Sequence, residues 1–273
     1  MDYIQQAIDK AREERQSKIG NADADGEASQ ASEPSRLTAP RDEKGVPQGI
    51  NYTQTQTQEL SSKILKDNRI VASLKGDQRT EHYRQLRTQV IQKMRANSWK
   101  SLAITSPNEN AGKSTTAVNL AISLSKEVNQ TVLLVDLNLR NPSVAQLMGI
   151  PVENGLIDHL INDVPVSELL INPGLERLVI LPGREDSAYS SEMLSGPAMK
   201  SLVEDLTSRY ESRIIIFDLP ALLVNDDALA FIPAVDSALM VVENGKTTEE
   251  EIKRSLELLE GTSLLGTLLN KLD

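Results

Sequence analysis

The stretch SLAITSPNENAGKSTTAVNLA, residues 101–121, decides the fold of this chain. Its first five residues form a largely apolar run, and apolar side chains recur at helical spacing after Lys113, so the stretch predicts a strand, a loop and a helix. A Gly-Lys-Ser sequence where the loop meets the helix lets backbone N–H groups and the helix N-terminus face a phosphate. We then expect Lys113 to reach the terminal phosphates and the Ser114 hydroxyl to bind Mg²⁺. The alternative is an ordinary turn between a strand and a helix.

Short apolar runs and amphipathic helical patterns alternate along the rest of the chain. The runs that predict strands lie at 131–136, 177–181, 213–218, 237–242 and 265–269. The patterns that predict helices lie at 78–96, 117–124, 199–206 and 252–259. Strands that are apolar throughout and separated by amphipathic helices indicate an α/β fold with a mostly parallel, doubly wound sheet covered on both faces. A ligand site is then expected beyond the C-terminal ends of the strands.

Two of the predicted strands end in an aspartate at the edge where the ligand should lie. VLLVDLNLRNP places Asp136 after one strand, and IIIFDLPALLVNDDA places Asp218 after another. Magnesium phosphate chemistry needs hard oxygen ligands and a group that orients the nucleophile, and these carboxylates supply both. The alternative is that either aspartate only caps the turn or helix that follows it.

Composition divides the 273 residues into three parts. Residues 1–19 carry a narrow apolar stripe and predict a short helix, which either docks on a partner or frays at the terminus. Residues 20–59 are rich in Gly, Pro, Ser, Gln and acidic residues and predict a disordered linker. Residues 60–273 predict the phosphate-binding domain.

The chain contains no cysteine and has a formal net charge of -10. We therefore expect a soluble protein of the reducing cytoplasm, since no apolar stretch reaches the roughly 18 residues that span a bilayer. Binding to nucleic acid depends on Lys and Arg that neutralise phosphates, so the acidic balance argues against a nucleic-acid partner.

These motifs together resemble the bacterial tyrosine kinases of capsule and exopolysaccharide systems, the CpsD/CapB family, which are relatives of the ParA and MinD ATPases. SPNENAGKST is similar to the family's SPxPGEGKST, and VLLVDLNLRNP is similar to its apolar run with DxDxRxP. IIIFDLPALLVNDDA resembles the family's D-x-P-P segment with a later Asp-Ala. Upstream, EHYRQLR matches the pattern E-x2-R-x2-R, which joins subunits into a ring in relatives.

The resemblance implies an ATP- and Mg²⁺-dependent tyrosine kinase in which Asp136 positions or deprotonates a tyrosine hydroxyl. Mg²⁺ would be held by Ser114, Asp136 and Asp218, with Arg140 neutralising charge or supporting assembly. The expected nucleotide contacts are Asn108, Glu109, Asn110, Ala111, Gly112, Lys113, Ser114, Thr115 and, for adenine, Asn270. The expected ring contacts are Glu81, Arg84 and Arg87; on residues alone these form a solvated helix face.

The resemblance also implies partners. The cytoplasmic tail of a membrane polysaccharide co-polymerase, or chain-length regulator, would activate the kinase and hold it at the inner face of the plasma membrane. Protein tyrosines would be its substrates. Two other functions stay open: an ATP-binding regulatory scaffold of the same export complex with weak or absent kinase activity, and a ParA/MinD-like positioning ATPase.

Three departures from the family pattern bear on this choice. Asn110 replaces a loop glycine, although Asn tolerates positive φ, so we expect the turn to survive. Asn138 replaces a second Asp, which should lower Mg²⁺ affinity or rate. The tyrosine-rich C-terminal tail is missing, so an acceptor within the chain must be one of Tyr3, Tyr52, Tyr83, Tyr189 and Tyr210. Among these the predicted linker makes Tyr52 the most accessible.

Overall fold

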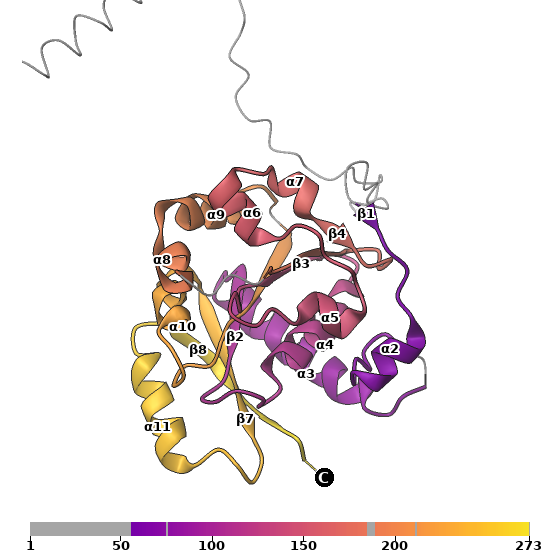
Figure 1. Cartoon of the computed structure of the whole chain (residues 1–273). Helices are drawn as coiled ribbons and strands as arrows, with labels where there is room; N and C mark the ends of the chain where they lie inside the picture. Colours follow the sequence, from indigo (N-terminus) through magenta and orange to yellow (C-terminus); the bar gives the residue numbers. More distant parts are fainter. Residues whose placement is uncertain (1–55, 75, 185–188, 211, 273) are drawn as a thin grey trace, which may run out of the picture. The chain divides into compact units, whose positions relative to one another are not determined.

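An eight-stranded sheet forms the centre of the computed structural model, which describes residues 56–74, 76–184, 189–210 and 212–272 (Figure 1). In spatial order the strands are β1 (Gln56–Thr57), β4 (Ile171–Asn172), β5 (Leu178–Leu181), β3 (Thr131–Asp136), β6 (Arg213–Asp218), β2 (Ser101–Thr105), β7 (Ser237–Glu243) and β8 (Ser263–Asn270). Every neighbouring pair is parallel except β4 with β5. The expected mostly parallel sheet is thereby confirmed.

Helices cover both faces of this sheet (Figure 1). They are α2 (Ser62–Asp67), α3 (Thr80–Ala96), α4 (Lys113–Ser125), α5 (Val144–Met148), α6 (Leu156–Asn162), α7 (Val166–Leu169), α8 (Ser190–Ser195), α9 (Pro197–Ser208), α10 (Asp227–Phe231), the 3-10 helix η1 (Ile232–Ala234) and α11 (Glu249–Leu258). The sequence did not predict the short helices from α5 to α8, because a helix of four to seven residues is too short to show a clear helical period.

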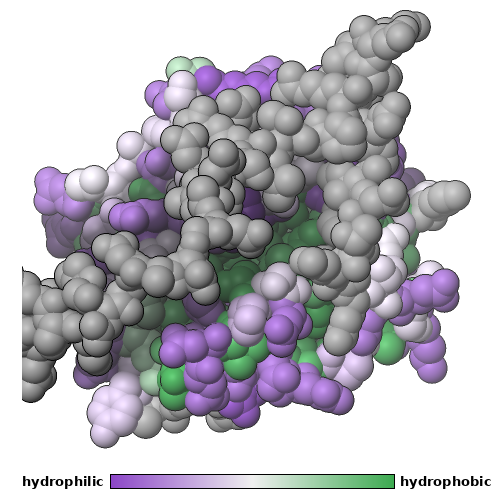
Figure 2. Space-filling model, turned by 90° about the horizontal axis from the view of Figure 1, so that it is seen from above, coloured by the Kyte–Doolittle hydropathy of each residue, from purple (hydrophilic) through white to green (hydrophobic). Residues whose placement is uncertain are grey.

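The side chains of each strand alternate between two hydrophobic cores, as the two-residue period of a strand requires. In β2, Leu102 and Ile104 pack into the core beneath α3, α4 and α5. Ala103, between them, packs into the opposite core beneath α9 and α10. This is the doubly wound arrangement predicted from the sequence. Hydrophilic residues predominate at the periphery of the face in Figure 2, and hydrophobic residues gather toward its middle.

Two sequence predictions need correction. The sheet begins at Gln56, so the predicted boundary at residue 60 is four residues late; two residues of a strand are too few to stand out from a polar segment. The pattern at 252–259 places Leu256 on one helix face with Ile252 and Leu259, but in α11 only the latter two pack against the core, whereas Leu256 is 40 % exposed. The predicted helix at 1–19 and the predicted linker up to residue 55 lie outside the described residues.

No helix in the described ranges is both long enough and apolar enough to span a membrane.

Candidate active site

Two residues of the loop between β2 and α4 adopt a left-handed backbone conformation before the helix begins. Asn110 has φ 61° and Gly112 has φ 94°. Asn110 therefore keeps the turn, as expected from the tolerance of asparagine for this conformation. At Gly112 a Cβ atom would lie 2.1 Å from Nδ2 of Asn270, so only glycine fits the position.

This loop presents unpaired donors at the start of a 13-residue helix. The backbone N–H groups of Gly112, Lys113 and Ser114 donate to no acceptor among the described residues. The side chain of Lys113, a residue only 8 % exposed, likewise makes no ion pair or hydrogen bond within the described ranges. Unpaired N–H groups, a helix N-terminus and an ammonium group together form a binding site for an anion such as phosphate.

Asp136 and Asp218 end neighbouring strands and are direct partners in the register of β3 and β6. Their relative exposures are 1 % and 0 %. Oδ1 of Asp136 accepts the N–H of Asn138 at 3.1 Å, and Oδ2 accepts those of Ser143 and Val144, both at 2.9 Å. Asp136 therefore does cap the start of α5, the alternative reading from sequence, and this capping fixes its carboxylate beside Asp218.

Asp218 is less well satisfied than its partner. Neither of its buried oxygens makes a hydrogen bond of good geometry with a described residue. The positive charge of Lys113 and the nearby Ser114 hydroxyl nevertheless oppose the rise in its pKa. A buried carboxylate without partners is costly. The donor set of Asp218, Asp136 and the Ser114 hydroxyl consists of the hard oxygen atoms that Mg²⁺ prefers, so the site fits that ion.

Both carboxylates are held closer to neutrality than free aspartates. Burial, and secondly the negative charge of Asp218, raises the pKa of Asp136 to about 7, against the opposing hydrogen bonds from three backbone N–H groups. Burial raises the pKa of Asp218 to about 6, against the opposing influence of Lys113 and Ser114. A carboxylate with a pKa near neutral pH is suited to taking and returning a proton.

Asn138, which replaces the family's second aspartate, is nearly buried and contributes its backbone N–H to Asp136. Its neutral amide adds no charge to the pair of carboxylates. The site therefore holds one negative charge fewer than the family pattern.

Arg140 binds a carboxylate that sequence reasoning did not single out. Its Nε and Nη2 donate to Asp227 at 2.8 and 3.1 Å, and the buried Ser190 hydroxyl donates to the same carboxylate at 2.9 Å. This network joins the segment after β3 to the starts of α8 and α10. The Asp-Ala of NDDA was the signal for Asp227, whereas nothing in the sequence marked Ser190.

Two other predicted nucleotide contacts bind protein groups. The Asn270 amide donates to the carbonyl of Ala111 at 2.9 Å and so connects the end of β8 to the phosphate loop. The Asn108 amide reaches Glu251 at the start of α11, where it adds to the Thr248 N–H in lowering the pKa of that carboxyl group. The remaining loop residues Glu109 and Thr115 lie on either side of the turn.

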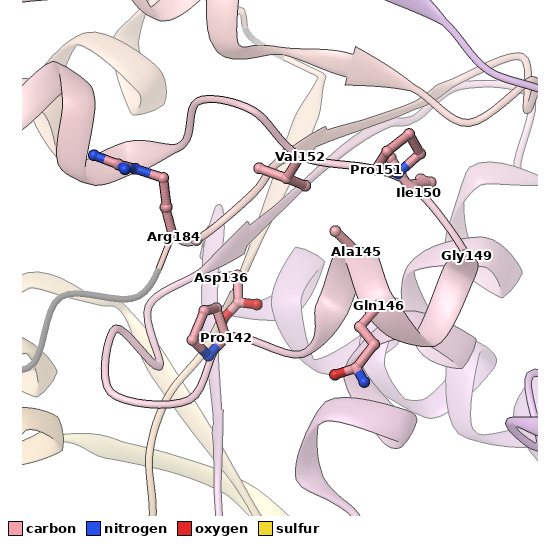
Figure 3. Close-up of a pocket in the computed structure, with 10 residues that line it drawn as sticks. Asp136, Pro142, Ala145, Gln146, Gly149, Ile150, Pro151, Val152 and Arg184 are labelled. Carbon is pink, nitrogen blue, oxygen red and sulfur yellow. The ribbon is translucent and has the colours of Figure 1, made fainter.

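A cavity of about 520 Å³ opens beside Asp136 (Figure 3). Its walls include Pro142, Ile150, Pro151 and Val152, and Arg184 lies at its rim. The Arg184 guanidinium donates to the Asp158 carboxylate at 2.9 and 3.0 Å, so its charge is balanced within the chain. The cavity thus combines apolar walls with one proton-accepting group.

The predicted ring contacts lie on α3 in two different settings. Arg84 pairs with Glu81 at 3.1 Å, and both side chains are exposed. Arg87 is mostly buried and pairs with Glu127 at 3.1 Å. Arg84 is therefore available at the surface, whereas Arg87 is part of the fold.

Comparison with known proteins agrees with this geometry. The AAA domain family model matches residues 100–261, more than half of the chain. The chain is 30 % identical over 193 residues to the tyrosine-protein kinase YwqD of Bacillus subtilis. This match covers 70 % of this chain and 80 % of YwqD. This chain belongs to the CpsD/CapB family of bacterial tyrosine kinases.

A longer relative and a solved structure show how much of other proteins this kinase family member corresponds to. It is 31 % identical over 211 residues to the succinoglycan biosynthesis transport protein ExoP of Rhizobium meliloti, covering 76 % of this chain but only 26 % of ExoP. The crystal structure of the chimeric protein CapA2B2 aligns with a TM-score of 0.68 and 27 % identity, covering 80 % of this chain and 93 % of that one. The kinase family member thus corresponds to about a quarter of ExoP and to nearly the whole of CapA2B2.

Proposed function

We propose that this chain is an ATP-dependent protein-tyrosine kinase that phosphorylates itself and regulates the synthesis and export of exopolysaccharide or capsule. The observation that carries the proposal is the direct pairing of Asp136 with Asp218 at the sheet edge, next to a loop of unpaired N–H groups. Phosphoryl transfer needs little more than positioning and charge stabilisation, and these groups supply both.

In this function the loop of residues 108–115 holds the phosphates of ATP through its N–H groups, with Lys113 on the terminal phosphates. Ser114 and Asp218 are the residues that would hold Mg²⁺, with Asp136 beside them. Bound Mg²⁺ would neutralise charge on the phosphates as the transferring bond breaks. Asn270 keeps the loop in shape from β8, and an adenine contact by the same residue remains part of the proposal.

Asp136 is the proposed base. Its carboxylate is fixed by three backbone N–H groups, and its pKa of about 7 suits removal of a proton from a phenol at neutral pH. The apolar walls of the adjoining cavity can receive an aromatic ring while its hydroxyl faces Asp136. Protein tyrosines are therefore the proposed acceptors.

The assembly and partners are proposed from the family pattern. Arg84, exposed beside Glu81, would contact a neighbouring subunit of a ring, with Arg87 behind it. The activator would be the cytoplasmic tail of a membrane polysaccharide co-polymerase or chain-length regulator, which would hold the kinase at the inner face of the plasma membrane. The match to about a quarter of ExoP, a succinoglycan biosynthesis transport protein, supports such a connection.

A regulatory scaffold that binds ATP but transfers little phosphate is the second candidate. Asn138 favours it, because one carboxylate fewer weakens the hold on Mg²⁺. A positioning ATPase is less well supported, because the net charge of -10 disfavours attachment to DNA.

Transfer of labelled phosphate from ATP separates these functions. We expect tyrosine in the wild-type protein to become labelled, and the label to vanish in Lys113→Met while the exposed Lys253→Met retains it. ATP binding without tyrosine label, with or without the partner tail, would support the scaffold instead.

A further inference from the structure

The three tyrosines in the described part of the chain have different surroundings. Tyr83 is partly buried, which raises its pKa, and it interacts with Thr116 and Asn119 on α4. The ring of Tyr210 lies under the guanidinium group of Arg213 at 3.8 Å. Tyr189 is 65 % exposed, and its hydroxyl makes no hydrogen bond to any described residue. Of these three side chains, Tyr189 is the most exposed, because Tyr83 and Tyr210 are both partly buried.

Tyr189 also adjoins a residue that is bound next to the active site. The next residue, Ser190, is fully buried and donates to Asp227, the carboxylate that binds Arg140. Earlier in the same segment, a Cβ atom on Gly183 would lie 3.3 Å from Cγ of Asp136. Gly183 therefore lies against Asp136, the proposed base, and Ser190 belongs to the network of Arg140 and Asp227, with Tyr189 directly before it in the chain.

We propose that Tyr189 is a phosphate acceptor of this chain and is phosphorylated by a second copy of it; this proposal rests on the kinase function proposed above. The bond between the γ-phosphorus and the oxygen of the ADP leaving group breaks, and a bond from that phosphorus to Oη of Tyr189 forms. The phenol proton passes to Asp136 of the second copy. The products are phosphotyrosine and ADP.

The geometry favours transfer between copies over transfer within one. Tyr189 does not line the cavity beside Asp136 of its own chain, whereas Gly183 and Arg184 of the same segment do. Ser190, the next residue, is fully buried and donates to Asp227, which restrains the backbone of Tyr189 at its place outside that cavity. A second copy can bind the exposed ring of Tyr189 while the hydrogen bonds of Ser190 to Asp227 stay intact.

The sequence makes the test direct, because trypsin separates all five tyrosines. Complete cleavage after Lys and Arg gives tyrosine peptides 1–10, 45–63, 80–84, 185–200 and 210–213. The full chain is incubated with Mg²⁺ and γ-labelled ATP, digested, and each peptide is measured for phosphotyrosine by mass spectrometry. We expect the label in peptide 185–200, its loss in Tyr189→Phe, and its retention in the matched variant Tyr210→Phe.

A mixing experiment tests the transfer between copies and separates an acceptor role from a structural one. Tyr189→Phe, which keeps its nucleotide site, is mixed with Lys113→Met, which keeps Tyr189 but cannot hold the phosphates. We expect the Lys113→Met copy to be labelled on peptide 185–200. Absence of that label, when wild-type protein labels itself there, would overturn transfer between copies.

The remaining outcomes distinguish this proposal from the kinase function. Tyrosine label confined to other peptides, such as 45–63, would overturn Tyr189 as acceptor and leave the kinase function intact. ATP binding with no labelled tyrosine in any peptide would overturn the kinase function, and Tyr189 as acceptor with it.

Discussion

Replacing Asp218 by asparagine should stabilise the nucleotide-free protein at neutral and alkaline pH while abolishing its use of Mg²⁺. The Asp218 carboxylate is fully buried and neither oxygen has a good hydrogen-bond partner among the described residues. Its pKa is raised from 3.8 to about 6. Each pKa unit is worth about 1.4 kcal/mol, so the ionised group costs the folded state about 3 kcal/mol at pH 8.

The pH dependence follows from the direction of this change. Because the pKa in the folded state is higher than in the unfolded state, stability is greatest below pH 4 and falls as the pH rises through 6. The amide introduced by Asp218→Asn cannot ionise, so the variant lacks this fall. The stability difference should be near zero at pH 4 and grow to about 1–3 kcal/mol at pH 8, less than the full cost because an amide is also polar and buried.

Urea denaturation at pH 4, 6 and 8 without nucleotide measures this difference. Asp136→Asn is the matched control: it removes the other carboxylate, but Asp136 accepts three backbone N–H groups that an amide satisfies less well. Although the pKa of Asp136 is raised further, to about 7, the lost acceptor for the Ser143 and Val144 N–H groups offsets that gain, so we expect a smaller net gain from this variant. A wild-type protein that is more stable than Asp218→Asn at pH 8, or a difference that does not change with pH, would refute the reasoning.

Other predictions concern the loop and the surface. Gly112→Ala should weaken ATP binding and lower the free energy of unfolding. The left-handed conformation alone costs an alanine about 1–2 kcal/mol. We expect a larger loss, because the new Cβ would lie 2.1 Å from Nδ2 of Asn270. Gly245→Ala is the control, since it has φ 71° and open space around it; equal losses in urea would show that the contact is unimportant. Arg84→Ala should lower the mass of the oligomer by light scattering without changing stability, whereas Arg87→Ala should also reduce stability, by about 1 kcal/mol or less, through its lost ion pair. An unchanged mass for Arg84→Ala would remove this residue from the ring interface.

The sequence predicts the parts of the fold whose residues repeat regularly. The strands β2, β3 and β6 have the predicted bounds, because each is an apolar run closed by a polar residue at the sheet edge. The two-residue strands β1 and β4 were missed, since they are too short to show a period. Their pairing comes from contacts with β5 and its neighbours, which local sequence does not encode.

The same limit applies to the site. Each strand-end aspartate could be named from its own segment, but their direct pairing depends on strand order, because β6 lies between β3 and β2. Asp136 proved to be both a helix cap and a member of the pair, roles that sequence reasoning had treated as alternatives. The binding of Arg140 to Asp227 joins segments far apart in the chain, so it emerges only from the three-dimensional fold.

Isothermal titration of the folded protein with ATP, in the presence and absence of Mg²⁺, tests the central claim most directly. We expect ATP to bind with an affinity that Mg²⁺ increases, and the Mg²⁺ effect to disappear in Asp218→Asn while Lys113→Met loses affinity altogether. A folded wild-type protein that binds no ATP in the presence of Mg²⁺ would contradict the account.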